Sequence, residues 1–292
     1  MRYYIQLLRP HQWLKNLFVF APLFFSNNIL KIDYLIPTCF VFLAFCFISS
    51  SIYCINDIHD AEADRLHPEK CKRPIASGNI SRKQASFLAI VLAIMAIALV
   101  CIVPNTKALP LIGILLSYWL MNIAYSFKLK QYGIIDIFCI AIGFVLRVLI
   151  GGQATGIWIS QWIVLLTFLL ALFLALTKRY DDCCIFEATG KRPRKSITTY
   201  NKEFITTSIS IIAAITSVCY IMYTLSEAVI ERTGSQYLYL TSVWVLAGLF
   251  RYVQNMIVYK RSNSPTRLLI NDSFLHLCII GWIVSFIIII YV

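Results

Sequence analysis

Acidic, amide and basic side chains crowd into one short segment directly after a strongly apolar run. The segment reads NDIHDAEADRLHPEKCKRP (Asn56–Pro74), and it follows the run VFLAFCFISSSIY. Successive residues on an α-helix are ~100° apart, so Asn56, Asp57, Asp60 and Asp64 fall within one arc of ~100°. Several carboxylates would therefore point the same way from the end of a helix.

Such a cluster is suited to holding a magnesium ion together with a diphosphate. Like charges at i,i+4 repel each other unless a cation lies between them. Mg2+ prefers oxygen ligands and is typically held by one or two carboxylates plus substrate phosphates. Lys70, Lys72 and Arg73 follow in the sequence and would bind the remaining phosphate oxygens. Pro68 and Pro74 would end the helix and fold this basic segment back.

The alternative is a solvated helix end stabilised by salt bridges. In that interpretation Asp64 pairs with Arg65 or Lys70 and binds no ligand. We favour the ligand site, because ionisable side chains at the boundary of a membrane usually mark functional positions.

The elements that carry these residues are membrane-spanning helices. Of the 292 residues, 59% are hydrophobic and only 14% are charged, whereas soluble domains carry about 25% charged residues. A span needs about 20 mostly apolar residues, and the apolar runs are continuous, which argues against a β-barrel. We predict an all-α integral membrane protein with nine spans, of which the first and sixth are the shortest: Leu17–Leu30, Leu35–Cys54, Gln84–Cys101, Ala108–Ala124, Ile134–Ile150, Trp162–Leu176, Thr206–Leu225, Tyr237–Val258 and Phe274–Tyr291.

The distribution of Lys and Arg predicts the topology. With a cytoplasmic N-terminus, the outer connections hold only Lys31, Lys107 and Arg232, while most of the 26 basic residues lie inside. This bias is the positive-inside pattern and places the C-terminus outside the cell's inner (plasma) membrane. The net charge of +12 then reflects topology and attraction to anionic headgroups and phosphates, not nucleic-acid binding. We expect a single domain over 1–292, with functional cytoplasmic connections at about 55–83, 125–133 and 178–205.

The acidic segment resembles the first aspartate-rich motif of the UbiA superfamily of intramembrane prenyltransferases. That motif reads N-D-x-x-D-x-x-x-D followed by H-P-x-K-x-x-R-P, and this chain matches it over about twenty positions. The resemblance implies nine helices around a central polar cavity open to the cytoplasmic side. It also implies Mg2+ as cofactor, held by Asn56, Asp60 and Asp64, with Asp57 either joining these ligands or orienting them.

The second site distinguishes members of the superfamily. Enzymes acting on aromatic acceptors usually carry a second multi-aspartate motif, but this chain has no acidic residue between Arg147 and Asp181. Within Tyr125–Gly152 there is one carboxylate, Asp136, which shares a helix face with Arg147. Extra cations are what two separate phosphorylated substrates need.

Three stretches resemble the decaprenyl-phosphate phosphoribosyltransferases within that superfamily. Besides the segment around Asp136, Leu8–Phe25 matches R-P-x-Q-W-x-K-N, and the region Lys178–Tyr200 matches K-R-Y-x-E…R-x-x-L-x-x-Y, with departures at Asp182 and Ile197. The resemblance implies transfer of a 5-phosphoribosyl group from phosphoribosyl diphosphate to a polyprenyl monophosphate. The product would serve as a precursor of the arabinose donor for cell-wall arabinan.

The resemblance also implies a set of binding residues, some with a second interpretation. Arg147 would contact phosphate or pair with Asp136. Tyr125 would be an interfacial aromatic or a donor to the ribose phosphate, and one of Lys178 and Arg179 would be a plain positive-inside anchor. His67 suits a structural turn better than a catalytic base. The full set of expected substrate-binding residues is Lys15, Lys70, Arg73, Tyr125, Lys128, Lys130, Asp136, Arg147, Lys178 and Arg179.

Two other functions remain open from the sequence. An ordinary UbiA-type enzyme would move a prenyl group from its diphosphate to an aromatic acceptor. A divalent-cation transporter would use the aspartates as its pathway, but it predicts carboxylates spread across the depth of the membrane, whereas these gather at one face. The sequence is compatible with a homo-oligomer and does not decide the oligomeric state.

Overall fold

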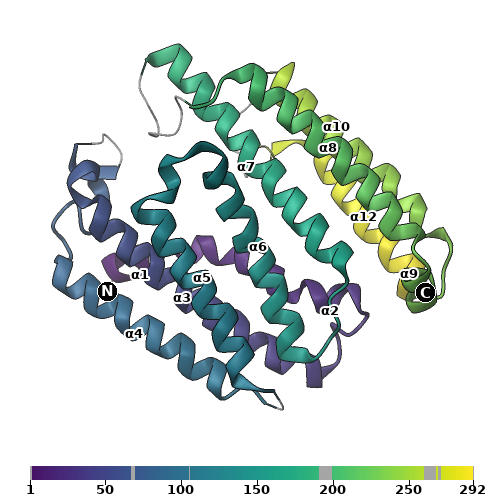
Figure 1. Cartoon of the computed structure of the whole chain (residues 1–292), viewed down its shortest axis with the longest axis horizontal. Helices are drawn as coiled ribbons and strands as arrows, with labels where there is room; N and C mark the ends of the chain where they lie inside the picture. The colour runs from purple at the N-terminus through teal and green to yellow at the C-terminus, as the bar shows by residue number, and fades with distance from the viewer. Residues whose placement is uncertain are drawn as a thin grey trace. The chain divides into compact units, whose positions relative to one another are not determined.

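The computed structural model consists of helices and the turns that connect them, and it describes residues 2–66, 70–104, 106–190, 199–259, 268 and 271–291 (Figure 1). No strand occurs in these ranges. His67 and the basic residues 191–195, which include Arg194 of the expected signature, lie outside them.

Seven of the described helices are long and apolar enough to cross a membrane. They correspond to seven of the nine predicted spans. The seven are α3 (Ile32–Arg65), α4 (Arg82–Cys101), α5 (Ala108–Phe127), α6 (Gly133–Thr155), α7 (Gln161–Thr189), α8 (Lys202–Leu225) and α12 (Ser273–Tyr291).

The two other predicted spans are built from shorter elements. After α1 (Arg2–Leu8), the first one consists of the 3-10 helix η1 (Pro10–Phe20) and α2 (Ala21–Phe25). Pro22, near the start of α2, has no N–H to donate to the preceding turn. After α9 (Glu227–Thr233), the eighth span begins as η5 (Tyr237–Thr241) and continues as α10 (Ser242–Ile257). The count of nine therefore stays a prediction.

Two of the expected cytoplasmic connections begin as helix. Helix α3 has 34 residues and continues to Arg65, and α7 has 29 residues and continues to Thr189. Both helices extend beyond the predicted apolar spans, so the regions from 55 and from 178 onward are initially helical. Two short 3-10 turns, η2 (Lys70–Lys72) and η3 (Leu129–Gln131), carry several of the basic residues.

Local sequence explains where these helices start and stop. Helix α4 starts at a capping box in which Ser81 and Gln84 bond each other's backbone N–H. Helix α7 begins after the N-cap Ser160 and ends at Gly190, whose φ of 66° suits a residue without Cβ. These caps fix the start of α4 and both ends of α7, the helix that carries Arg179.

The chain forms two compact units. The first comprises residues 1–130 and 142–159, and the second comprises 131–141 and 160–292, so α6 contributes to both. In the first unit α3 is the most buried span and packs against α4 and α5 through Val41, Phe45 and Ile48. In the second unit α7 packs on α8, and α10 packs on α12. Large exposed apolar side chains such as Ile90 and Phe87 suit a lipid-facing surface.

Candidate active site

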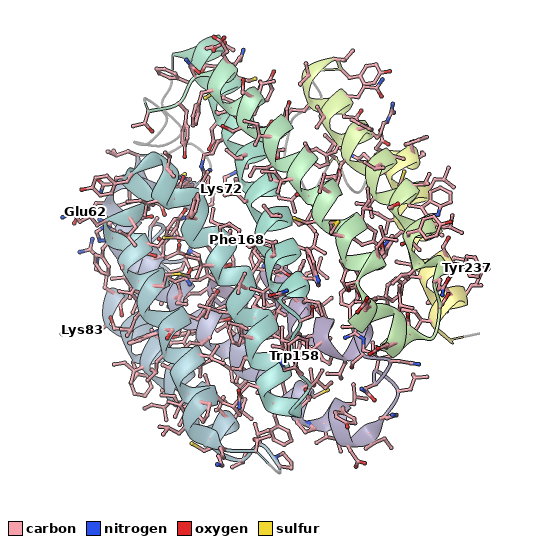
Figure 2. The ribbon with its side chains drawn as sticks, turned by 45° about the vertical axis from the view of Figure 1, so that its right-hand side comes forward. Glu62, Lys72, Lys83, Trp158, Phe168 and Tyr237 are labelled. Carbon is pink, nitrogen blue, oxygen red and sulfur yellow. The ribbon has the colours of Figure 1, made fainter. Side chains whose placement is uncertain are left out.

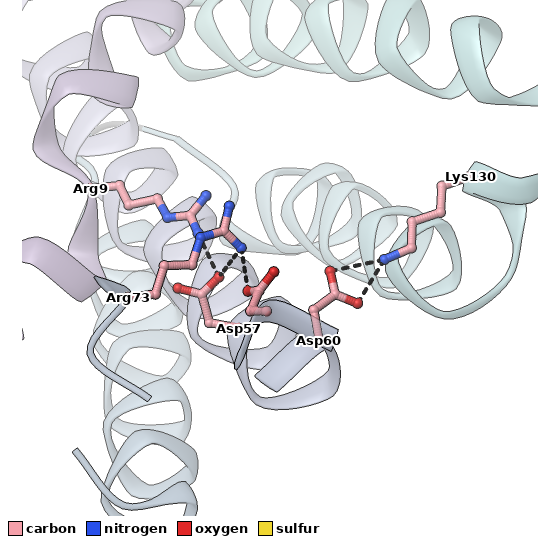
Figure 3. A network of polar contacts seen from close by, with 6 residues as sticks. Arg9, Asp57, Asp60, Arg73 and Lys130 are labelled. Carbon is pink, nitrogen blue, oxygen red and sulfur yellow. Dashed lines mark hydrogen bonds and ion pairs between the residues drawn. The ribbon is translucent and has the colours of Figure 1, made fainter. Parts of the chain in front are cut away.

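Three carboxylates near the cytoplasmic end predicted for α3 are bound by basic side chains from other parts of the chain (Figure 3). Asp57 Oδ1 accepts from Arg9 Nη2 at 2.5 Å and from Arg73 Nη1 at 3.2 Å. The same Arg73 Nη1 donates to Asp64 Oδ2 at 2.7 Å. The predicted grouping of these carboxylates on one helix face is thus observed, and Arg73 bridges two of them.

Asp60 is bound by a residue far away in sequence. Lys130, in the 3-10 turn η3 after α5, donates to both oxygens of Asp60 at 3.0 and 3.1 Å (Figure 3). Both side chains are 27% exposed. The basic stretch after α5 therefore joins the acidic cluster of α3.

Burial makes these ion pairs necessary. Asp57 and Asp64 are 2% and 4% exposed, and a buried carboxylate without a partner is strongly unfavourable. The side chains of Arg9 and Arg73 are 19% and 27% exposed. The solvent-accessible side of these three ion pairs is therefore cationic, as the binding of phosphate groups requires.

The residues present suit Mg2+ when it binds together with a phosphate ligand. Within the described ranges, no three His, Cys, Asp or Glu side chains form a ready-made metal centre. Mg2+ does not need one, because it is usually held by one or two carboxylates, waters and substrate phosphates. Asn56, Asp60 and Asp64 follow one another by four residues on α3 and supply the hard oxygen atoms that this ion prefers.

The other predicted binding residues of the first unit belong to other parts of the chain, on or next to η1, η2 and α5. Lys15 is exposed on η1 and Lys70 is exposed on η2. Tyr125 is half-buried near the end of α5, and Lys128 is exposed directly after that helix.

Arg147 is bound by neutral partners within the first unit. It is 6% exposed. Its Nε donates to Asn16 Oδ1 at 2.8 Å, and its Nη2 donates to Tyr118 Oη at 2.7 Å. Its guanidinium also lies over three aromatic rings, that of Tyr118 being the nearest at 4.8 Å. These contacts hold η1, α5 and α6 together around one buried cation.

Asp136 has a different basic partner, Arg179, in the second unit. Arg179 Nε and Nη2 donate to the two oxygens of Asp136 at 2.6 and 2.9 Å. Both residues are 0% exposed, and Asp182 accepts from Arg179 Nη1 at 3.2 Å. Arg179 is therefore a buried bidentate ligand of a carboxylate, whereas its neighbour Lys178 is exposed as a positive-inside anchor would be.

Sequence reasoning missed two of these roles. Arg9 is absent from the expected binding residues, although it is the first residue of the R-P-x-Q-W-x-K-N signature, which is the signal that points to it. Arg9 contacts Asp57 from a residue with a backbone φ of 52°, and no composition pattern reveals either feature. Tyr200, expected only as a signature residue, donates a hydrogen bond to the carbonyl of Gly133.

Residues 19–279 match the sequence model of the UbiA prenyltransferase family. This chain belongs to the UbiA prenyltransferase family. It is a transferase and an integral membrane protein. The seven described spans and the paired acidic motif agree with that assignment.

Relatives and solved structures cover almost the whole chain. A protein of Mycolicibacterium smegmatis named decaprenyl-phosphate phosphoribosyltransferase is 31% identical over 96% of this chain and 89% of its own length. A protein of the same name from Corynebacterium glutamicum is 30% identical over 99% of this chain and 86% of its own. The structure of a UbiA homolog from Archaeoglobus fulgidus bound to GPP and Mg2+ superposes with a TM-score of 0.72 at 21% identity, covering 99% of this chain and 100% of that one.

Proposed function

We propose that this transferase moves the 5-phosphoribosyl group of phosphoribosyl diphosphate to a polyprenyl monophosphate and releases diphosphate. The observation that carries the proposal is the near-full-length similarity to relatives named decaprenyl-phosphate phosphoribosyltransferase. The chain's own residues support it, because Arg9, Arg73 and Lys130 lie together at the acidic motif. Lys15, Lys70 and Lys128 add further cations in the same unit.

The chemistry needs positioned anions more than it needs a proton acceptor. A phosphate-monoester oxygen of the acceptor attacks C1 of the ribose, and the bond between C1 and the diphosphate oxygen breaks. A phosphate monoester has a second pKa of about 6, so the attacking oxygen is already anionic near neutral pH. Arg73 and Lys130 would bind phosphate oxygens, and Tyr125 would donate to the ribose phosphate. Holding both substrates in line supplies much of the rate enhancement.

Magnesium would be held by Asn56, Asp60 and Asp64, where it would act as a Lewis acid that neutralises charge on the departing diphosphate. Single in-line displacement inverts the anomeric carbon. An α-linked donor should therefore give a β-linked product.

A labelled-donor assay tests the proposed reaction. Membranes containing the full-length chain should transfer radiolabel from phosphoribosyl diphosphate into lipid when polyprenyl phosphate and Mg2+ are present. Asp60→Asn and Asp64→Asn should abolish the transfer without loss of folded protein. Glu62→Gln is the matched control, because Glu62 is a 79% exposed side chain on the same helix (Figure 2). No label in lipid would overturn the proposal, and an α-linked product would overturn single displacement.

Transfer of a prenyl group remains the second candidate. It is favoured by the observation that a UbiA homolog from A. fulgidus with this fold was solved with GPP and with DMAPP. The same membranes supplied with a labelled prenyl diphosphate and an aromatic acceptor would then give a labelled aromatic product, with no dependence on polyprenyl phosphate.

A further inference from the structure

Asp57 differs from the other carboxylates of the acidic motif. It is 2% exposed, and the two arginine contacts described above both end on its Oδ1 atom. Asp60 is more exposed and faces one flexible lysine. A metal ion that bound Oδ1 of Asp57 would have to displace two guanidinium groups, and the whole side chain, including Oδ2, is 2% exposed. Reaching it is far costlier than displacing one lysine from a partly exposed carboxylate.

We propose that Asp57 is a positioning residue that holds Arg9 and Arg73 ready for the phosphate groups of a diphosphate ligand, and that it is not itself a magnesium ligand. The proposal deepens the function proposed above, but it requires only that the bound ligand carries a diphosphate. It assigns a separate role to the second residue of the motif.

The shared arginine shows why such a residue is needed. Arg73 Nη1 contacts Asp64 at 2.7 Å and Asp57 at 3.2 Å. If Asp64 turns its oxygens toward a metal ion, Arg73 loses its shorter contact and would swing free. Its contact with Asp57 keeps the guanidinium in place, and the remaining N–H donors of the fork are then available to phosphate oxygens.

The other arginine is aimed at Asp57 by an unusual backbone conformation. Arg9 has φ 52° and ψ 59°, in the left-handed region that a residue with a side chain seldom adopts. It also precedes Pro10, which restricts its backbone further. Strain of this kind is retained where the surrounding structure enforces it, often at functional sites.

Helix α3 enforces that conformation through one face. Ser50 Oγ donates to the carbonyl of Leu8 at 2.8 Å and accepts from Trp13 Nε1 at 3.0 Å. The Arg9 guanidinium lies over the ring of Tyr53 at 5.0 Å. Ser50, Tyr53 and Asp57 are spaced i, i+3 and i+7, so the same face of α3 fixes the turn and receives the side chain.

The charges of the cluster predict that metal and diphosphate strengthen each other's binding. Asp57, Asp60 and Asp64 are matched by Arg9, Arg73 and Lys130. A metal ion alone would leave displaced cations beside a dication, and diphosphate alone would meet three carboxylates. Bound together, the metal takes Asp60 and Asp64 while the cations take the phosphate oxygens. Such coupling is reciprocal.

Binding measurements on the full-length chain in lipid nanodiscs test the proposal. Titration with Mn2+ alone, followed by electron paramagnetic resonance, reports the metal site. Titration with inorganic diphosphate in the presence of Mg2+, followed by calorimetry, reports the phosphate site. Asp57→Asn should weaken diphosphate binding about tenfold or more, as loss of charged hydrogen bonds does. It should leave the Mn2+ affinity within about twofold.

Three further variants separate this role from a structural one. Asp60→Asn should lose Mn2+ binding in the absence of diphosphate and, because the two ligands are coupled, should also weaken diphosphate binding in the presence of Mg2+. Asp57→Glu keeps the charge and should recover part of the diphosphate affinity. Glu62→Gln also removes a carboxylate of α3 that pairs with an arginine, Arg82 at the start of α4, and it should change neither measurement.

Arg9→Gln keeps the proposal testable if Asp57→Asn does not fold. It should lower diphosphate affinity while Mn2+ affinity is kept or raised. Equal loss of the diphosphate and Mn2+ affinities in Asp57→Asn and Arg9→Gln, or no change in either affinity, would overturn the positioning role. Because inorganic diphosphate is the probe, this result does not depend on which donor the transferase uses, whereas the labelled-donor assay does.

Discussion

The carboxylates of this protein fall into groups whose charge balance differs. Asp60 forms an ion pair with one lysine, and both side chains are partly exposed. Asp60 can therefore exchange this partner when a ligand binds. Asp136 is held on both oxygens by Arg179, and both side chains are fully buried. The first arrangement is suited to exchange of partners, and the second is suited to holding a structure.

Replacement of Arg179 should therefore be among the most destabilising single changes in the second unit. Arg179→Gln leaves Asp136 buried without its bidentate partner and should lower the free energy of unfolding by about 3–5 kcal/mol. Lys178→Gln removes the neighbouring exposed charge and should cost less than about 1 kcal/mol. Denaturation of the purified variants in detergent measures both values. Comparable losses in the two variants would contradict the structural role of the buried pair.

For these residues, the sequence predicted which carboxylates share a helix face better than it predicted the basic partner of each. The 3.6-residue period correctly brought Asp57, Asp60 and Asp64 onto one face, because that follows from helix geometry alone. It suggested Arg65 or Lys70 as partners of Asp64, whereas the structure shows Arg73. The pairs of Asp60 with Lys130 and of Asp136 with Arg179 join residues 70 and 43 positions apart, so they depend on tertiary packing that no local pattern contains.

Helices α10 and α12 of the second unit are largely apolar in sequence, but a polar contact joins them. Asp272, just before α12, accepts from Arg251 Nη2 at 2.9 Å and from Asn255 Nδ2 at 2.8 Å, both on α10. It also accepts from the backbone N–H of Leu275 at 2.9 Å, in the first turn of α12. Burial alone would raise the pKa of Asp272, but these hydrogen bonds outweigh it and hold the pKa at about 2.

The depressed pKa gives this contact a defined pH dependence. In the unfolded chain an aspartate has a pKa of about 3.9, so the contribution of Asp272 to stability is complete above that value. It is lost as the pH falls from about 4 to about 2, because the folded state then binds the proton less readily than the unfolded state. Asp272→Asn lacks this titration. The stability difference between wild type and Asp272→Asn should shrink over that interval, as followed by thermal unfolding at stepped pH, and a constant difference would contradict the assignment.

The sequence was more informative about whole spans than about their ends. Apolar runs of about 20 residues are dictated by the thickness of the bilayer, and seven predicted spans correspond to helices. The predicted ends of α3 and α7 fell short because Asn56–Arg65 and Lys178–Thr189 are polar but remain helical. The first span, Leu17–Leu30, was predicted as one run, whereas a 3-10 helix ends within it at Phe20 and an α-helix with Pro22 in its first turn follows. Hydropathy therefore identifies the apolar spans in the sequence, but it does not show how far each helix continues past its span.

For the molecule as a whole, the distribution of basic residues predicts which helix ends face the cytoplasm. We expect the acidic motif and the ends of α5 and α7 to face the cytoplasm, because the positive-inside bias acts on the short connections near these ends. The connection between α9 and η5 should then face the outside. Thr189 and Gln236 are exposed residues at these two kinds of position.

Cysteine labelling can test this sidedness with one matched pair of variants. In a background in which the ten native cysteines are replaced by serine or alanine and transfer activity is retained, Thr189→Cys should react with a membrane-impermeant maleimide only in inverted vesicles. Gln236→Cys should react in intact spheroplasts. The reversed pattern would place the acidic motif on the side of the membrane opposite to soluble phosphoribosyl diphosphate. The proposed donor could then not reach Asp60 and Lys130 from the cytoplasm, so the topology result bears directly on the choice of substrate.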